Sequence, residues 1–207
     1  MSWIAERFKY ENIAAEIEPA ARLRTKDSWL WKVLWVLMTV FSLGLSLLKM
    51  SWSTFFKIYA TTIGPIQGYP RSFERLGRRL LVHECQHVKQ AVFCGYFIPI
   101  LGWIPGRWGR HFCAWVGLPF MLLGYVVLPF PIGLCYGRYR LELDADIVSW
   151  KWALKNKKGY TPKDVRDHAT ARVDKVAGGA YLWAWPKPLV RRGYKKASER
   201  VIAKVGQ

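Results

Sequence analysis

The chain has 207 residues, of which 52% are hydrophobic and 12 are Trp, and these values exclude a disordered tail. A chain of this length can bury a core without disulfides or metals as staples. The formal net charge is +18, from 32 Lys and Arg against 14 Asp and Glu, which indicates a polyanionic neighbour (anionic lipid, nucleic acid or an acidic polymer) or else a solvated basic surface.

The four cysteines form no C-x-x-C pair and suit neither a zinc knuckle nor a dense disulfide framework. They are Cys85, Cys94, Cys113 and Cys135. Each lies in an apolar stretch, where a free Cys acts as a small hydrophobe. We therefore expect reduced thiols and a site that faces a reducing compartment. The first 27 residues carry mixed charge, so no cleavable signal peptide is visible.

Two helices are predicted at the N-terminal end. Residues 1–27 form an amphipathic helix that Pro19 interrupts. Its apolar stripe consists of Ile4, Phe8, Ile13, Ala14 and Ile17. Residues 28–50 form an apolar helix in which only Lys32 and Lys49 are charged. Flanking Trp residues make this pattern typical of a membrane-spanning or deeply inserted helix, and a buried core helix is the alternative.

Residues 51–175 are predicted to form one domain. Within it, residues 53–70 are rich in Phe, Ile, Tyr and Thr, which predicts a strand, a turn at Gly64-Pro65 and a second short strand. A helix is predicted over residues 72–94, where apolar and His side chains recur at spacings of three and four.

An apolar insertion occupies residues 91–137 of this domain. Its second part, residues 111–137, carries no charge and is long enough to span a bilayer, but its Pro and Gly residues favour a kinked helix or a re-entrant hairpin. We expect residues 29–50 and 111–135 to lie in lipid or against an equally apolar protein surface.

Helices are predicted again in the C-terminal part. One covers residues 139–158, and Thr161 begins the next as an N-cap, followed by Pro162 and by Asp164 in the first turn. Residues 176–207 form an aromatic and basic segment, typical of a membrane interface. The same composition suits single-stranded nucleic acid, but no nucleic-acid motif is present and the apolar segments favour the membrane.

The sequence V-H-E-C-Q-H-V-K-Q at residues 82–90 carries an H-E-x-x-H motif. His83 and His87 are four residues apart, so on a helix both imidazoles lie on one face and can share one zinc ion at about 2.0–2.1 Å. Glu84 lies on the adjacent face, close enough to take a proton from the attacking water. The motif therefore predicts a zinc site with Glu84 as general base.

A later pair of acids can supply the third ligand that a catalytic zinc needs. Glu142 and Asp146 are four residues apart on the same predicted helix, so Glu142 can bind the metal while Asp146 orients a ligand His. Such a pair on an apolar helix face is costly without a positive partner, which we interpret as zinc. The alternative is two core histidines and a helical salt-bridge pair, with no metal.

H-E-x-x-H followed by E-x-x-A-D resembles the gluzincin metallopeptidases, most closely the membrane-embedded branch of CAAX prenyl endopeptidases and the bacterial heat-shock membrane protease. The resemblance implies that His83, His87 and Glu142 are ligands, that Glu84 is the base and that Asp146 is the partner of His83. With the predicted elements, it implies a mainly α fold with a small β-hairpin or sheet, a minimal gluzincin-like core with apolar membrane-type helices.

A second likeness is to short phage-encoded proteins in which H-E-x-x-H-x-x-Q, here His83 to Gln90, follows a T-T-I-G segment, here Thr61 to Gly64.

A peptidase also needs a donor for the developing oxyanion. His168 is our first choice, because related enzymes place this group on a helix downstream of the ligands; an ordinary surface His is the alternative. Tyr139, Arg140 and Tyr160 are further candidates. Such enzymes also pair substrate with a strand edge, for which residues 57–70 are the candidate, with a purely structural hairpin as the alternative.

The predicted function is zinc-dependent peptide-bond hydrolysis at or in a membrane, in which zinc activates a water molecule and Glu84 takes its proton. The expected partners are a peptide or protein substrate and anionic lipid headgroups. The alternative is a non-enzymatic structural component of a viral particle or membrane complex, within a larger assembly, with a structural or vestigial zinc site.

Overall fold

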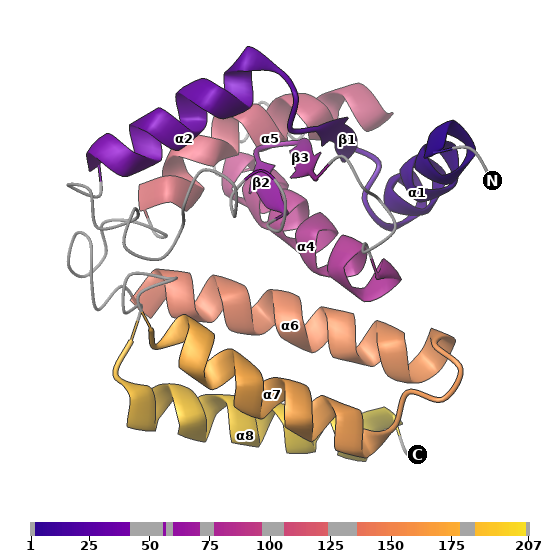
Figure 1. Cartoon of the computed structure of the whole chain (residues 1–207), viewed down its shortest axis with the longest axis vertical. Helices are drawn as coiled ribbons and strands as arrows, with labels where there is room; N and C mark the ends of the chain where they lie inside the picture. The colour runs from indigo at the N-terminus through magenta and orange to yellow at the C-terminus, as the bar shows by residue number, and fades with distance from the viewer. Residues whose placement is uncertain are drawn as a thin grey trace. The chain divides into compact units, whose positions relative to one another are not determined.

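The computed structural model divides the chain into two units, Met1–Leu122 and Leu123–Gln207 (Figure 1). It describes residues 3–41, 56, 60–70, 77–96, 106–123, 136–178 and 185–205. The described elements are mainly helices with one small sheet of three strands, which confirms the predicted fold class at that level. The boundary between the units falls inside the segment predicted as a single domain over residues 51–175.

The sheet of the first unit has the strand order β1-β3-β2. Strands β2 (Thr61–Ile63) and β3 (Ile66–Tyr69) form the predicted hairpin, and Gly64 adopts a φ of 52° in its turn, a conformation that favours glycine. Strand β1 (Arg22–Thr25) pairs in parallel with β3. The prediction of a helix over residues 1–27 is therefore wrong beyond α1 (Trp3–Ile17), because distant β3 supplies the backbone partners of β1.

Helices cover the two faces of this sheet. Successive side chains of a strand point to opposite faces, and on β3 the Gln67 amide donates to Cys85 Sγ of α4 (Arg78–Gly95), at 3.3 Å. Gly68 faces the other way, where a Cβ would overlap the buried indole ring of Trp31 on α2 (Trp29–Phe41). The sheet thus lies between α2 and α4, in agreement with Figure 1.

Helix α5 (Gly106–Leu122) packs directly on α4 through glycines. A Cβ at Gly95 would overlap the carbonyl oxygen of Cys113, and one at Gly117 would overlap that of Ala91. Glu18 follows α1 directly in the sequence, and its fully buried carboxylate accepts two hydrogen bonds from Arg110 of α5, at 2.9 and 2.6 Å. The close approaches at Gly95 and Gly117 make α4 and α5 one closely packed pair.

No helix among the described residues is both long enough and apolar enough to cross a membrane. Of the segments predicted to lie in lipid, residues 42–50 and 124–135 lie outside the described part of the chain. Cys85 and Cys94 are free thiols in the described part of the chain. Burial raises the pKa of the Cys85 thiol to about 12.

The described residues of the second unit form helices that lie side by side in Figure 1: α6 (Tyr136–Asn156), α7 (Pro162–Val176) and α8 (Lys187–Val205). The predicted start of α7 is confirmed, because the Thr161 and Asp164 side chains form a reciprocal capping box. The apolar faces meet in one core around the fully buried Trp150 and Tyr194. The aromatic and basic C-terminal segment contains α8.

Candidate metal centre

The two histidines of the H-E-x-x-H motif lie one turn apart on α4, and both are buried. Their Nε2 atoms are 3.3 Å apart. Two nitrogens that bind one tetrahedral zinc at about 2.0–2.1 Å are separated by roughly 3.3–3.4 Å. The described geometry of His83 and His87 therefore fits two ligands of one metal ion without any rearrangement of the helix.

Gln90 orients the second histidine. Its Oε1 atom lies 2.8 Å from His87 Nδ1, so an amide oxygen there accepts the Nδ1–H and leaves the Nε2 lone pair to face His83. This is the tautomer that a metal ligand needs, and hydrogen bonds of this kind fix the orientation of metal-binding imidazoles. Gln90 ends the H-E-x-x-H-x-x-Q pattern, but its position in the sequence alone does not predict this hydrogen bond.

The expected base, Glu84, is held by the edge strand of the sheet. Thr62 of β2 donates from Oγ1 to Glu84 Oε2 at 2.5 Å, and Glu84 is buried. A charge-assisted hydrogen bond of this length is strong and restricts the carboxylate to one orientation. The T-T-I-G segment and the H-E-x-x-H helix are thus joined by a direct contact, which the sequence reading did not predict.

A buried lysine lies in the same polar cluster. Lys26 follows β1, and its Nζ donates to Thr61 Oγ1 at 2.6 Å and lies 5.6 Å from the centre of the Trp31 ring. Burial lowers the pKa of Lys26 to about 7, and the negative charge of Glu84 opposes this shift. The cluster therefore contains a positive group that the electrostatics link to Glu84, at a position that carries no motif.

The two acids of α6 share a positive partner on α7. Arg172 donates from Nη2 to Glu142 Oε2 and from Nε to Asp146 Oδ2, each at 2.7 Å. Tyr194 of α8 donates to the same Asp146 oxygen at 2.8 Å. The sequence predicts zinc as the positive partner of this acid pair, and the structure supplies Arg172 as a positive partner. Whether Asp146 also orients His83 stays a prediction.

One group of side chains among the described residues could hold a metal ion: His83, His87 and Glu142. All three are buried. These are the three ligands expected from the sequence. Two imidazoles and one carboxylate form a donor set that suits zinc and leaves a position open in a tetrahedral site.

Three of the four expected oxyanion donors have packing contacts within the second unit. Trp150 Nε1 donates to His168 Nδ1 at 2.8 Å, so the proton of a neutral His168 is on Nε2. Tyr139 is buried against Gly193, where a Cβ would overlap its hydroxyl oxygen. Arg140 is exposed and Tyr160 half-buried. A role for any of these groups in an oxyanion site stays a prediction.

Comparisons with protein-family models, with curated proteins and with solved structures found no match for this chain.

Proposed function

We propose that the protein is a zinc-dependent peptide hydrolase. The observation that carries the proposal is the arrangement on α4, where the Nε2 atoms of His83 and His87 lie at the separation expected for two ligands of one zinc ion, beside an oriented Glu84. Glu142, within the same buried group, completes a set of three protein ligands. The resemblance of the two motifs to gluzincins supports the same assignment.

Each residue has a defined task in this proposal. Zinc, when bound, supplies a Lewis acid that polarises the scissile carbonyl and lowers the pKa of a water molecule. Thr62 holds Oε2 of Glu84, so that Oε1 takes the proton of the attacking water and passes it to the leaving amine. Arg172 holds Oε2 of Glu142, and Oε1 of the same carboxylate would be the ligand atom.

Strand β2 is the proposed place for an extended substrate. In the sheet order β1-β3-β2 it lies at the edge, and its three residues are half-buried. A peptide that adds to a sheet edge gains backbone hydrogen bonds in register with the strand. Because Thr62 of β2 touches Glu84, a peptide paired with this strand would pass close to the base.

The test of the metal site compares substitutions of different histidines in the full chain. His83→Ala should remove the metal, about one zinc per chain in the wild type. The matched control is His111→Ala, because His111 faces the carbonyl oxygen of Ala20 and belongs to no ligand group. Zinc content is measured by elemental analysis after dialysis. Equal zinc in both variants would refute the assignment of His83.

The test of catalysis is Glu84→Gln on a casein-like or membrane-protein substrate, with and without a chelator. The amide keeps the shape of the carboxylate but cannot accept a proton, so zinc should stay while hydrolysis falls about 10²–10⁴-fold. Zinc binding without hydrolysis in the wild type would instead support the structural alternative, which the burial of all three ligands also favours.

A further inference from the structure

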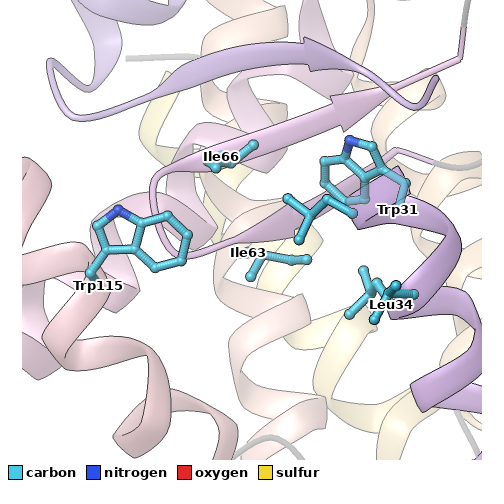
Figure 2. Close-up of a pocket in the computed structure, with 7 residues that line it drawn as sticks. Trp31, Leu34, Ile63, Ile66 and Trp115 are labelled. Carbon is cyan, nitrogen blue, oxygen red and sulfur yellow. The ribbon is translucent and has the colours of Figure 1, made fainter. Parts of the chain in front are cut away.

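An apolar pocket opens between α2, the β2–β3 hairpin and α5, away from the histidine pair. Figure 2 shows Trp31 and Leu34 on one side, Trp115 on the other, and Ile63 and Ile66 of the hairpin between them. Leu30 and Val33 complete the lining, and the volume is about 150 Å³. Every lining residue is apolar or aromatic, so the pocket suits a ligand segment without polar atoms.

Large exposed hydrophobic side chains continue this lining across the surface. On α2, Trp29 is 72% exposed and lies one turn before Val33. On α5, Trp108 is 77% exposed, and Phe112 and Trp115 follow it on the same face of the helix. We name these residues, with Leu30, the α2–α5 surface. Scattered exposed hydrophobic residues are normal, but stripes that lead into an apolar pocket mark an interaction site.

The charged side chains of α2 and α5 are all basic. Neither α2 nor α5 contains an acidic residue, while Lys32 and Arg107 are exposed on them. The chain as a whole has a formal net charge of +18. Trp side chains next to Lys and Arg are typical of the membrane–water interface, where the ring sits at headgroup depth and the cation meets anionic lipid.

We propose that the α2–α5 surface docks on an anionic membrane, with an acyl chain of a lipid in the pocket. An acyl chain has no hydrogen-bonding groups to satisfy, whereas a peptide would bring backbone N–H and C=O groups that this lining cannot pair. The exposed cations hold the phosphate headgroups, and the aromatic stripes enter the interface. This inference is independent of the proposed hydrolase activity.

The first test measures cosedimentation of the full chain with vesicles of phosphatidylcholine, with or without phosphatidylglycerol. The variant Leu30→Glu/Val33→Glu places two acids at the mouth of the pocket, at positions that are 39% and 42% exposed. The control is Asn156→Glu/Thr170→Glu, which also adds two acids, at exposed positions on α6 and α7 outside the segments expected to meet lipid. Circular dichroism checks that both variants fold.

Wild type and the control should bind the anionic vesicles equally, and the Leu30→Glu/Val33→Glu double variant should bind at least about tenfold more weakly. Binding to pure phosphatidylcholine should be weak for all three. Equal binding by the double variant and the control would overturn the docking surface and would leave a protein as its partner.

The second test locates the acyl chain. Phosphatidylglycerol with a photoreactive group near the end of its acyl chain is cross-linked to the bound protein, and the labelled peptides are identified by mass spectrometry. Labels should fall on peptides that contain Leu34, Ile63 or Trp115, which line the pocket on three elements. Ile63→Trp, which fills the pocket, should lower this labelling severalfold while vesicle binding persists. Labelling confined to other peptides would overturn the pocket as the acyl-chain site.

Discussion

Replacing Arg172 by leucine should destabilise the C-terminal helices much more than replacing Arg166 on the same helix. The Arg172 side chain is 10% exposed, and those of its partners Glu142 and Asp146 are 4% and 3% exposed. Arg166 pairs with Glu199 at the surface, where the two side chains are 52% and 49% exposed. The two ion pairs therefore have similar lengths but opposite solvation.

The expected magnitude follows from what the substitution leaves behind. Leucine at position 172 leaves two buried carboxylates without their guanidinium, and breaking a buried pair in this way costs about 3–5 kcal/mol. Since about 1.4 kcal/mol corresponds to a factor of ten, amide hydrogen exchange in α6–α8 should accelerate on the order of 10²–10³-fold. Removing the exposed Arg166 should change exchange a few-fold at most, because water screens that pair.

Hydrogen exchange of the full chain, followed by mass spectrometry of peptides from α6, α7 and α8, measures both variants under the same conditions. Saturating zinc should restore part of the lost protection in Arg172→Leu, since a cation bound by Glu142 replaces one positive partner. Equal acceleration in Arg172→Leu and Arg166→Leu would refute the argument that burial makes this ion pair structurally important. The absence of any rescue by zinc would count against Glu142 as a ligand.

Three further predictions concern the first unit. Thr62→Val should lower kcat about 10–100-fold with little change in zinc content, because Glu84 loses its charge-assisted hydrogen bond. Thr62→Ser should restore both the hydrogen bond and kcat. Equal rates in all three proteins would exclude a positioning role for Thr62. Lys26→Met should flatten the pH dependence of the free energy of unfolding. Because the pKa of Lys26 is about 7 in the folded chain and near 10.4 in the unfolded chain, the wild type gains about 1.4 kcal/mol of stability per pH unit between those values. The stability advantage of the variant, measured by urea unfolding, should therefore be largest near pH 7 and shrink as the pH rises, and a constant difference would refute the buried cation. Gly117→Ala should lower the midpoint of thermal unfolding much more than Gly77→Ala. A Cβ at position 117 would overlap the backbone of α4, whereas a Cβ at position 77 would meet nothing within 4 Å. Equal midpoints would contradict the close contact between α4 and α5.

Features with a local cause could be predicted from the sequence. The i, i+4 spacing that places His83 and His87 on one face needs only an α-helix. The capping box at Thr161 needs only four consecutive residues, and the hairpin turn at Gly64 needs only a residue that tolerates positive φ. For the same reason the elements that contain these residues were predicted with the correct type.

Features that depend on distant partners could not be predicted in this way. Strand β1 has no period of its own that separates it from the preceding helix, and its hydrogen bonds come from β3. The contact of Thr62 with Glu84 depends on how β2 packs on α4. One signal could have identified Arg172: it falls on the stripe of α7 that otherwise contains Val165, Ala169, Val173 and Val176, and a charge on an apolar stripe predicts a buried partner.

The parallel pairing of β1 with β3 has a consequence for the rate of folding. Helices α6, α7 and α8 are consecutive and make their core contacts with each other, so their unit has a low contact order and should form quickly. The first unit must instead close the loop between residues 25 and 66 before its sheet exists. A complete chain that refolds from the unfolded state should therefore form its later half first, and the apolar side chains of α2 stay exposed until that one strand pair closes.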